Sequence, residues 1–385
     1  MRPLLIVGTR PEAIKMAPVI KRCQHENNIE PIICFTGQHK EMLQQVADYF
    51  ELVPDIDLEL MARNQTLSQL TARCLEGLDG VIEKFIPDCV VAQGDTTTVL
   101  AASMISFYKR LPFIHVEAGL RTNNLLAPWP EEYNRRVASV ATALHCAPTE
   151  QAAHCLRREG IEDQSILVTG NTVIDALYYT VERERKQSSK WSNKYGKIFQ
   201  NRLVLITGHR RENFGTGFES ICLALRELSQ SFPDTSFIYP VHLNPNVREP
   251  VFRLLAGCKN VHLIEPVAYP EFVWLMDQST FIITDSGGVQ EEAPSLNKPV
   301  LLMRETTERP EAVELGMVRL VGTDRDTIVS SASELLSDSS SFDKLWKQKS
   351  PYGDGESAER IVSGMVDVLG SKVFNGRENE ILRVA

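Results

Sequence analysis

The sequence predicts an α/β protein made of two doubly wound, Rossmann-like domains. Short runs of aliphatic and β-branched residues alternate with segments of helical periodicity, a pattern typical of parallel sheets covered by helices. The pattern runs twice, because it restarts at Arg202 after a charged, serine-rich stretch at residues 182–197. A chain of 385 residues is also too long for one ordinary core and suits two domains.

Composition places the junction between these domains in the region from Gly170 to the end of the charged stretch. We expect the first domain at residues 1–170 and the second at residues 171–355. A break rich in glycine and proline at residues 351–355 precedes a last amphipathic helix, expected at residues 356–370, which would return the chain to the first domain. Residues 371–385 are predicted to form a poorly ordered tail.

With 43% hydrophobic and 24% charged residues, the chain has the composition of a soluble globular protein. No apolar run approaches the roughly 18 residues of a membrane helix, and no signal peptide is evident, so we expect a cytoplasmic protein with no membrane partner. A net charge of −9 argues against non-specific nucleic-acid binding. The eight cysteines are scattered without a C-x-x-C pair, so they are interpreted as reduced core residues rather than metal or redox ligands.

The first half alternates between strands and helices from its start. After the first strand, Thr9 is a plausible helix cap, and an apolar stripe at helical spacing follows it, formed by Ala13, Met16, Ala17 and Ile20. The dinucleotide fingerprint G-x-G-x-x-G is absent, which removes the main support for a nicotinamide or flavin enzyme. Strands are expected at residues 4–8, 31–36, 88–93, 112–116, 143–147 and 166–169, and helices at residues 99–108, from 131 onward and at 173–181.

From Arg202 the alternation repeats, with strands expected at residues 203–207, 236–241, 261–265, 281–284 and 299–303. In doubly wound sheets, ligands bind outside the carboxyl ends of the parallel strands. Polar residues follow the strands of both halves at these ends. They include Arg10, Gln38, His39, Asp95, Glu117, His209, His242 and Ser286.

The most informative turn follows the strand expected at residues 281–284. Ser286-Gly287-Gly288 stops the β-branched run, after which the chain becomes compatible with a helix. Two glycines let backbone N–H groups approach an oxyanion, and the helix dipole favours negative charge there, so we expect a phosphate. Glu291 or Glu292 would then accept hydrogen bonds from sugar hydroxyls, and phosphate plus ribose indicates a nucleotide. The alternative is a purely structural turn.

Three carboxylates near strand ends, Asp95, Glu117 and Glu131, suggest acid/base chemistry opposite this phosphate loop. Carboxylates gathered in one cleft raise one another's pKa, so one can act as an acid while another is a base. Asp95 and Glu117 could instead cap helices, and Glu131 could be an ordinary first-turn acid. Other polar residues also have structural alternatives: a solvated His209, a buried His242, and a surface ion pair of Arg210 or Arg211 with Glu212.

Nine short strings stand in order along the chain: GTRPEAIK at 8–15, GDTTT at 94–98, HVEAGLRT at 115–122, PWPEE at 128–132, TGNT at 169–172, GHRRE at 208–212, YPVHLNP at 239–245, DSGG at 285–288 and TERPE at 307–311. Together they resemble the non-hydrolysing UDP-N-acetylglucosamine 2-epimerases, bacterial enzymes that supply UDP-N-acetylmannosamine for surface polysaccharides. The resemblance runs from residue 2 to about residue 369.

The resemblance implies a glycosyltransferase-B-like architecture, with the active site in the cleft between the domains and UDP held mainly by the second domain. It implies anti elimination of UDP to give 2-acetamidoglucal, followed by re-addition of UDP after a proton returns to the other face of C2. This chemistry requires no redox cofactor and no metal. The resemblance also implies a homodimer.

The resemblance assigns catalysis to Asp95, Glu117, Glu131 and His209, the last as a donor to the diphosphate. The implied substrate-binding residues are Arg10, Lys15, Phe272, Ser286, Gly287, Gly288, Glu292 and Arg309, with the uracil near Phe272. In some relatives a second substrate molecule binds beside the first and activates the enzyme, and the matching residues are Gln38, His39, Gln65, Arg210 and His242. Asn64 stands where such relatives carry an arginine, which removes one bidentate group from that site.

Related activities remain alternatives. A hydrolysing 2-epimerase would release UDP and free N-acetylmannosamine, and another 2-epimerase could act on a modified UDP-diacetamido sugar. A retaining glycosyltransferase shares the architecture but needs an acceptor groove. A regulatory protein that only binds nucleotide sugars would keep the phosphate loop without needing three carboxylates.

Overall fold

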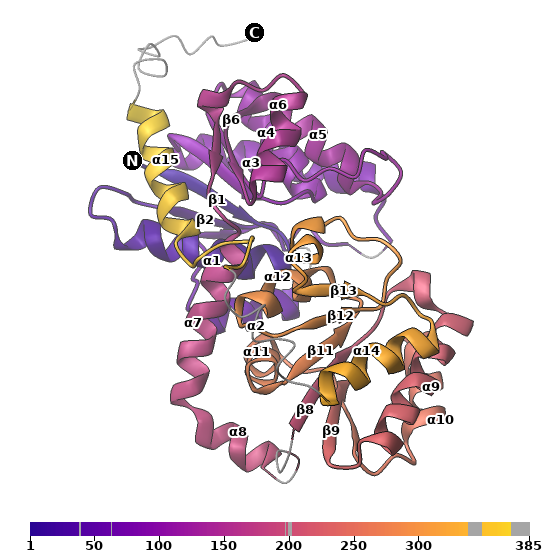
Figure 1. Cartoon of the computed structure of the whole chain (residues 1–385). Coiled ribbons are helices and arrows are strands. Elements are labelled where there is room, and N and C mark those ends of the chain that lie inside the picture. The colour runs from indigo at the N-terminus through magenta and orange to yellow at the C-terminus, as the bar shows by residue number, and fades with distance from the viewer. Residues whose placement is uncertain (38–39, 63, 197, 199–201, 338–348, 371–385) are drawn as a thin grey trace. The chain divides into compact units, whose positions relative to one another are not determined.

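The computed structural model describes residues 1–385 except 38–39, 63, 197, 199–201, 338–348 and 371–385 (Figure 1). The chain divides into two compact units. The first unit contains Met1–Ala176 and the chain from Tyr352 onward, and the second contains Leu177–Pro351. The sequence-based boundaries were residues 170 and 355, whereas the chain crosses between units after residues 176 and 351.

The first unit is built on a seven-stranded sheet with the order β3-β2-β1-β4-β5-β6-β7. Every strand pair is parallel. The order reverses between β1 and β4, which is the switch point where doubly wound sheets bind ligands. The strands are β1 Pro3–Val7, β2 Ile32–Phe35, β3 Ile56–Asp57, β4 Cys89–Gln93, β5 Phe113–Val116, β6 Thr142–Ala147 and β7 Ile166–Val168.

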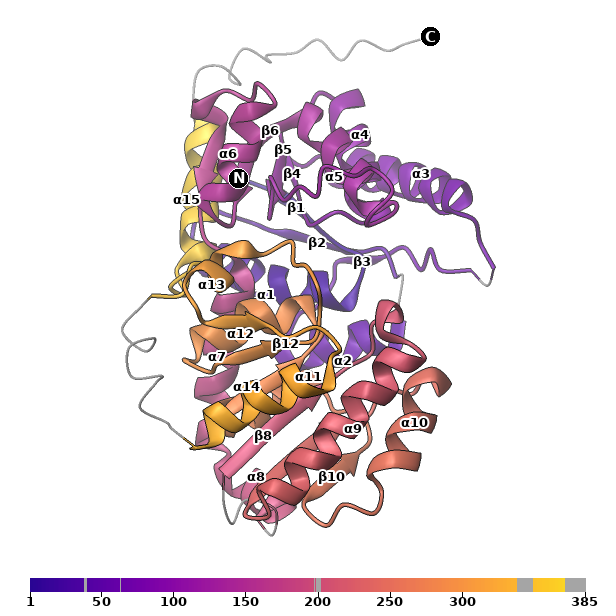
Figure 2. The same cartoon turned by 45° about the vertical axis from the view of Figure 1, so that its right-hand side comes forward.

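Helices cover both faces of this sheet. α3, α4 and α5 pack side by side over one face, while α1 packs with α2 and α15 (Figure 2). α1 begins where expected, because Thr9 and Glu12 form a reciprocal capping box and the stripe starting at Ala13 is buried. The helices are α1 Arg10–His25, α2 Lys40–Phe50, α3 Leu67–Phe85, α4 Thr97–Tyr108, α5 Glu131–Ala141, α6 Glu150–Arg158 and α15 Ser357–Gly370.

The second unit repeats the architecture with a six-stranded parallel sheet in the order β10-β9-β8-β11-β12-β13. Its core joins side chains of α9, α10 and α14 to one face of the sheet. The strands are β8 Arg202–Thr207, β9 Thr235–Pro240, β10 Val261–Ile264, β11 Phe281–Thr284, β12 Val300–Leu302 and β13 Val318–Leu320. The helices are α7 Thr172–Lys186, which crosses from the first unit, α8 Ser188–Tyr195, α9 Thr216–Ser231, α10 Pro245–Leu255, α11 Tyr269–Gln278, α12 Gly287–Ser295, α13 Pro310–Glu314 and α14 Arg325–Ser337.

Two doubly wound parallel sheets confirm the predicted fold class. The short strands β3 and β13 were not predicted, because two or three residues carry too little periodicity. The chain crosses between the units inside α7, within the junction region expected at residues 170–197, and α7 and α8 make most of the charged stretch helical. None of the described helices has both the length and the apolar character needed to cross a bilayer.

Candidate functional site

Glu117 is the most tightly held of the predicted catalytic residues. It directly follows β5, its side chain is 7% exposed, and its carboxylate accepts hydrogen bonds from Lys15 Nζ at 2.5 Å, Asn171 Nδ2 at 2.9 Å and Gln93 Nε2. Its backbone φ is 64°, a left-handed conformation that costs a non-glycine residue about 1 kcal/mol or more. A strained backbone that aims a charged side chain at a strand end is typical of functional sites.

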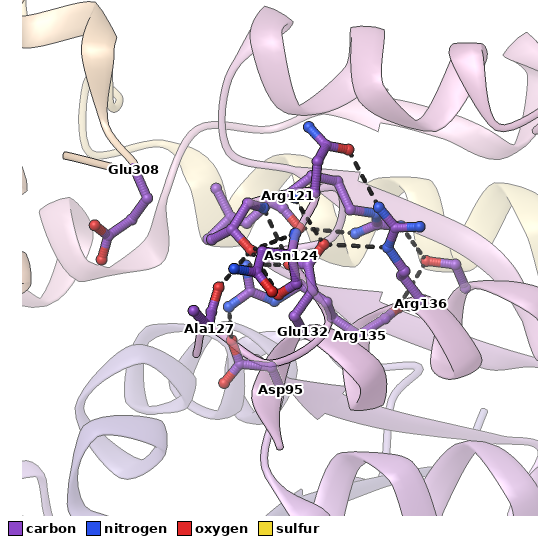
Figure 3. Close-up of polar contacts among 12 residues, drawn as sticks. Asp95, Arg121, Asn124, Ala127, Glu132, Arg135, Arg136 and Glu308 are labelled. Atoms are coloured by element: carbon purple, nitrogen blue, oxygen red, sulfur yellow. Dashed lines mark hydrogen bonds and ion pairs between the residues drawn. The ribbon is translucent and has the colours of Figure 1, made fainter. Parts of the chain in front are cut away.

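Asp95 follows β4 and is held by α5. Its carboxylate pairs with Arg135 Nη2 at 2.6 Å, and its carbonyl oxygen accepts a hydrogen bond from Asn134 Nδ2 at 2.9 Å (Figure 3). His115 supports the preceding peptide, because its Nε2 donates to the Gly94 carbonyl oxygen at 2.7 Å. Burial lowers the pKa of His115 to about 4, so the ring is neutral and carries its proton on the nitrogen that faces Gly94.

Glu131 and Glu132 open α5 and have different environments. Glu132 has a fully buried side chain that accepts hydrogen bonds from the backbone N–H groups of Thr122 and Asn123 at 3.0 and 3.2 Å, and it pairs with Arg136 at 3.1 Å (Figure 3). Glu131 is partly exposed, and among the described residues no hydrogen bond or ion pair engages it. Glu132 therefore shapes the loop after Arg121, and the two neighbouring carboxylates differ in burial and in partners.

The first two turns of α1 contribute Arg10 and Lys15. Arg10 is exposed at the first position of the helix, and the Lys15 ammonium group pairs with the Glu117 carboxylate. Glu12 is buried between them and accepts hydrogen bonds from Gly8 N–H at 2.6 Å and Thr9 N–H at 3.3 Å. Burial, opposed by these hydrogen bonds, raises the pKa of Glu12 to about 7. The carboxyl is thus a buried cap of the helix rather than a reactive group.

The Ser-Gly-Gly loop in the second unit has the predicted geometry. β11 ends at Thr284, Ser286 is the N-cap of α12, and the Ser286 hydroxyl does not cap the helix. The first N–H groups of α12 lack intrahelical partners, as at every helix start. A Cβ added to Gly287 would lie 3.1 Å from Arg309 Nη1 and 3.3 Å from Arg210 Nη2. Two guanidinium groups therefore flank a helix N-terminus, an arrangement typical of anion sites, and the loop is a candidate for one.

Carboxylates hold both arginines in place. Arg309 Nε donates to Glu291 at 2.6 Å, and its Nη1 donates to Glu308 at 2.9 Å. Burial alone would raise the pKa of Glu308, but Arg309 and Arg304 hold it at about 2. Arg210 is fixed through its backbone N–H on Asp285, at 2.9 Å. Among the described ion pairs, Glu212 contacts Arg304 at 2.9 Å and neither Arg210 nor Arg211, so the surface ion pair considered for these arginines is not formed.

His209 follows β8 beside the same loop. The fully buried Asp285 accepts the His209 N–H at 2.9 Å, and the other oxygen of that carboxylate lies 3.6 Å from His209 Nδ1. The His209 ring stacks on His242, with ring centroids 5.4 Å apart. His242 is exposed, so the alternative of a buried histidine is wrong. The His209 ring is therefore placed between the buried carboxylate of Asp285 and the ring of His242.

The predicted ribose and uracil residues lie on α12 and α11. Glu292 accepts a hydrogen bond from Tyr269 hydroxyl at 2.8 Å, and its other oxygen lies 3.7 Å from where a Cβ on Gly288 would stand. That carboxylate is therefore close to the phosphate loop. Phe272 is half-buried one turn after Tyr269.

The candidate regulatory residues come from both units. Gln38 and His39 lie outside the described residues. Gln65 contacts Arg73 and Met61 in the first unit, whereas Arg210 and His242 stand beside Gly287 and His209 in the second. Arg210 thus lies at the phosphate loop itself.

Sequence reasoning missed the residues that hold the predicted ones. The sequence shows only that these are charged or amide residues in or near the motifs. It does not show which site residue each of them contacts. The missed residues are Gln93, Glu132, Arg135, Asn171 and Asp285. Glu291, considered with Glu292 for the sugar hydroxyls, instead accepts a hydrogen bond from Arg309.

Comparison with known proteins gives consistent results. The sequence matches the family described as UDP-N-acetylglucosamine 2-epimerase over residues 21–366. It is 50% identical over 369 residues to the UDP-N-acetylglucosamine 2-epimerase of Escherichia coli K12, covering 95% of this chain and 98% of the relative. The Neisseria meningitidis UDP-GlcNAc 2-epimerase, solved with UDP-GlcNAc bound, is similar at 48% identity and a TM-score of 0.89, over 95% of this chain and 100% of that one.

A more distant structure agrees. The Methanocaldococcus jannaschii UDP-GlcNAc 2-epimerase, solved in complex with UDP-GlcNAc and UDP, is 34% identical with a TM-score of 0.79, over 95% of this chain and 100% of that one. The similarity therefore extends through both units.

Proposed function

This chain belongs to the UDP-N-acetylglucosamine 2-epimerase family of isomerases, and we propose that it interconverts UDP-N-acetylglucosamine and UDP-N-acetylmannosamine without net hydrolysis. Membership rests on the match over residues 21–366 and on about half of all positions being identical to the Escherichia coli enzyme. The observation that carries the mechanism is the Glu117 carboxylate, strained into a left-handed backbone and held by at least three donors.

The proposed reaction begins with loss of UDP. No carbonyl adjoins C2 to delocalise charge, so a side-chain base cannot remove the C2 proton from a ground-state sugar. As the C1–O bond loosens, positive charge develops at C1 and acidifies that proton. The base takes the proton, the electron pair of the C2–H bond forms the C1–C2 double bond of 2-acetamidoglucal, and UDP leaves with the electrons of the C1–O bond.

Inversion then needs a proton on the opposite face of C2, followed by re-addition of UDP to C1. Asp95, Glu117 and Glu131 are the proposed acid/base groups. Inversion needs a group that exchanges a proton on each face of C2, which explains why more than one carboxylate is required. Their environments support different tasks. Asp95 and Glu117 are met by cationic donors, and Glu131 is free of described partners.

The second unit supplies the proposed leaving-group site. Backbone N–H groups of Gly287 and Gly288, with Ser286, Arg309 and His209, would stabilise the charge that develops on the departing diphosphate. Glu292 is proposed to bind the ribose hydroxyls, and Arg10 the phosphates or the sugar end. The second-unit residues of this set contact one another or their immediate neighbours around the Ser286 loop, which supports a single binding site for the nucleotide there.

Three further predictions belong to this proposal: a role in polysaccharide precursor synthesis, a cytoplasmic location and a homodimer. The pathway and the homodimer rest on the resemblance to the family, and the location rests on composition.

Proton NMR of purified protein with UDP-N-acetylglucosamine in deuterated water tests the proposal. We expect UDP-N-acetylmannosamine to grow with deuterium at C2 and with little free UDP. Stoichiometric UDP with free N-acetylmannosamine would instead establish the hydrolysing reaction. No reaction would contradict this substrate and direct attention to modified UDP-diacetamido sugars.

A further inference from the structure

Asn171 is joined both to Glu117 and to the point where the chain returns to the first unit. We propose that Asn171 is a positioning residue that orients the Glu117 carboxylate for proton transfer, an inference that rests on the proposed function. It was not among the residues assigned a role by motif resemblance, although it lies inside the TGNT string.

The hydrogen bonds of Asn171 fix the orientation of its side-chain amide. Its Oδ1 accepts the backbone N–H of Val173 at 3.1 Å, so its Nδ2 must be the group that faces Glu117 Oε1 at 2.9 Å. The residue is only 2% exposed. A short amide held at its oxygen has little freedom, so its nitrogen offers Glu117 a donor in a fixed direction.

The backbone of Asn171 is anchored independently of Glu117. Its N–H donates to the Tyr352 carbonyl oxygen at 2.7 Å. Gly170 is in a left-handed conformation, with a φ of 85°, and a Cβ there would lie 2.6 Å from Ser357 Oγ and 3.2 Å from the Cα of Gly353. Four residues further on, Asp175 Oδ1 accepts the N–H of Ala358 at 2.8 Å. The backbone of Asn171 is therefore held by contacts between residues 170–175, near the point where the chain leaves the first unit, and residues 352–358, where it returns.

The other donors to Glu117 cannot supply this direction alone. Lys15 Nζ ends a flexible four-carbon chain and can rotate around the same carboxylate oxygen. Gln93 binds the second oxygen. Asn171 adds a rigid constraint on the first oxygen, and the two amides together define the plane of the carboxylate. Displacement of a reacting group by about 1 Å can cost about 100-fold in rate.

Asn171→Asp separates an orienting role from a purely structural one. Aspartate keeps the shape of the side chain and can keep the hydrogen bond to Val173. An aspartate oxygen still accepts the Val173 N–H, so a purely structural role survives. The other oxygen faces Glu117 with like charge instead of a donor. We expect kcat for C2 epimerisation to fall about 10- to 100-fold, while KM and the Kd for UDP change less than about twofold. A wild-type kcat in the folded variant would overturn the proposal, as would a loss of UDP affinity equal to the loss of kcat.

Asn28→Asp is the matched charge control. Asn28 is exposed and precedes β2, at the amino edge of the sheet and away from the carboxyl ends, so we expect wild-type kinetics.

Thermal unfolding provides a second test that does not depend on activity. In a Glu117→Gln background, the side chain at 117 is uncharged and its amide can donate to the new aspartate. We therefore expect Asn171→Asp to lower Tm by several degrees in the wild-type chain, but by much less in the Glu117→Gln chain. Equal losses of Tm in both backgrounds would contradict the proposed contact between Asn171 and Glu117. A Glu117→Gln/Asn171→Asp double variant that unfolds as readily as the Asn171→Asp single variant would contradict it as well.

The two measurements separate this inference from the proposed function. If wild-type protein fails to epimerise UDP-N-acetylglucosamine, the proposed function is wrong. The thermal cycle then still decides whether Asn171 holds Glu117.

Discussion

At the scale of single residues, three carboxylates of the first unit stand in three different environments. Glu117 is buried among amides and a lysine, Asp95 is paired with one arginine, and Glu131 is partly exposed. The environment of each carboxylate sets its protonation behaviour and its geometry. The three groups are therefore not interchangeable, and replacing each should produce a different defect.

Asp95→Asn should lower turnover by about 100- to 10,000-fold, the usual contribution of an acid/base group. The amide has nearly the same shape but cannot accept a proton, and Asn134 still binds the backbone carbonyl of residue 95. UDP affinity should be unchanged, because the anion loop lies in the second unit. Steady-state kinetics and calorimetric titration with UDP measure both effects.

Asp48→Asn is the control for this change, since Asp48 is exposed on α2 and contacts Gln44. A wild-type rate in the Asp95 variant would remove Asp95 from the mechanism.

At the scale of elements, two helix starts serve different purposes. α12 begins with two glycines and leaves its first N–H groups for an anion, whereas α1 begins with a full capping box that satisfies its own donors. Both follow strands at the switch point of a parallel sheet. The presence or absence of a side-chain cap thus distinguishes the binding turn from the structural one.

Gly287→Ala should weaken UDP binding about tenfold, because the added methyl group would stand 3.1 Å from Arg309 Nη1 and displace the arginine from the anion. Calorimetric titration with UDP measures the change. Gly257→Ala in the same unit is the control, since a Cβ there meets nothing within 4 Å. Unchanged affinity in the Gly287 variant would contradict the phosphate-loop assignment.

Glu12→Gln should flatten the pH dependence of stability at the start of α1. The pKa of Glu12 is raised by burial from 4.5 to about 7 in the folded protein, so between these values the unfolded chain ionises and the folded chain does not. Stability from this group is therefore fully present below pH 4.5 and is lost as pH rises to about 7, by up to about 3 kcal/mol.

Urea unfolding of wild-type and Glu12→Gln protein across this pH range measures the difference. Asp175, whose pKa burial raises to about 6, contributes equally to both proteins and cancels in the comparison. Parallel stability curves would show that Glu12 does not titrate as described.

At the scale of the whole molecule, the chain leaves the first unit inside α7 and returns to it with α15. α15 packs against α1 and β6 through a buried face that includes Ile361 and Met365. The first unit is therefore completed by the last described helix, and a change at this end of the chain should act on that unit's stability and leave the nucleotide loop of the second unit intact.

Met365→Ala should cost about 2–5 kcal/mol of unfolding free energy, because it opens a cavity at a fully buried side chain. Val366→Ala on the next position is the control, since that side chain is 37% exposed and its loss should cost far less. UDP affinity should be unchanged in both folded variants. A matching loss of UDP affinity in the Met365 variant would contradict the assignment of nucleotide binding to the second unit.

The sequence by itself determined the two doubly wound units, the Ser286 loop at the end of β11 and the positions of Asp95 and Glu117 at strand ends. These features are local, because strand and helix periods, glycine pairs and helix caps are read within about ten residues of chain. The family resemblance added the chemistry, since ordered motifs identify residues even when their contacts are unknown.

Only the tertiary structure decided which residues hold the site together. Asn171 meets Glu117 across 54 residues of chain, Arg135 meets Asp95 across 40, and His209 meets Asp285 across 76. The tertiary structure also separated Glu132, which is buried and structural, from its neighbour Glu131. Contacts of this kind depend on the order of strands in the sheet and on which face of a helix is covered, and spacing along the chain carries neither.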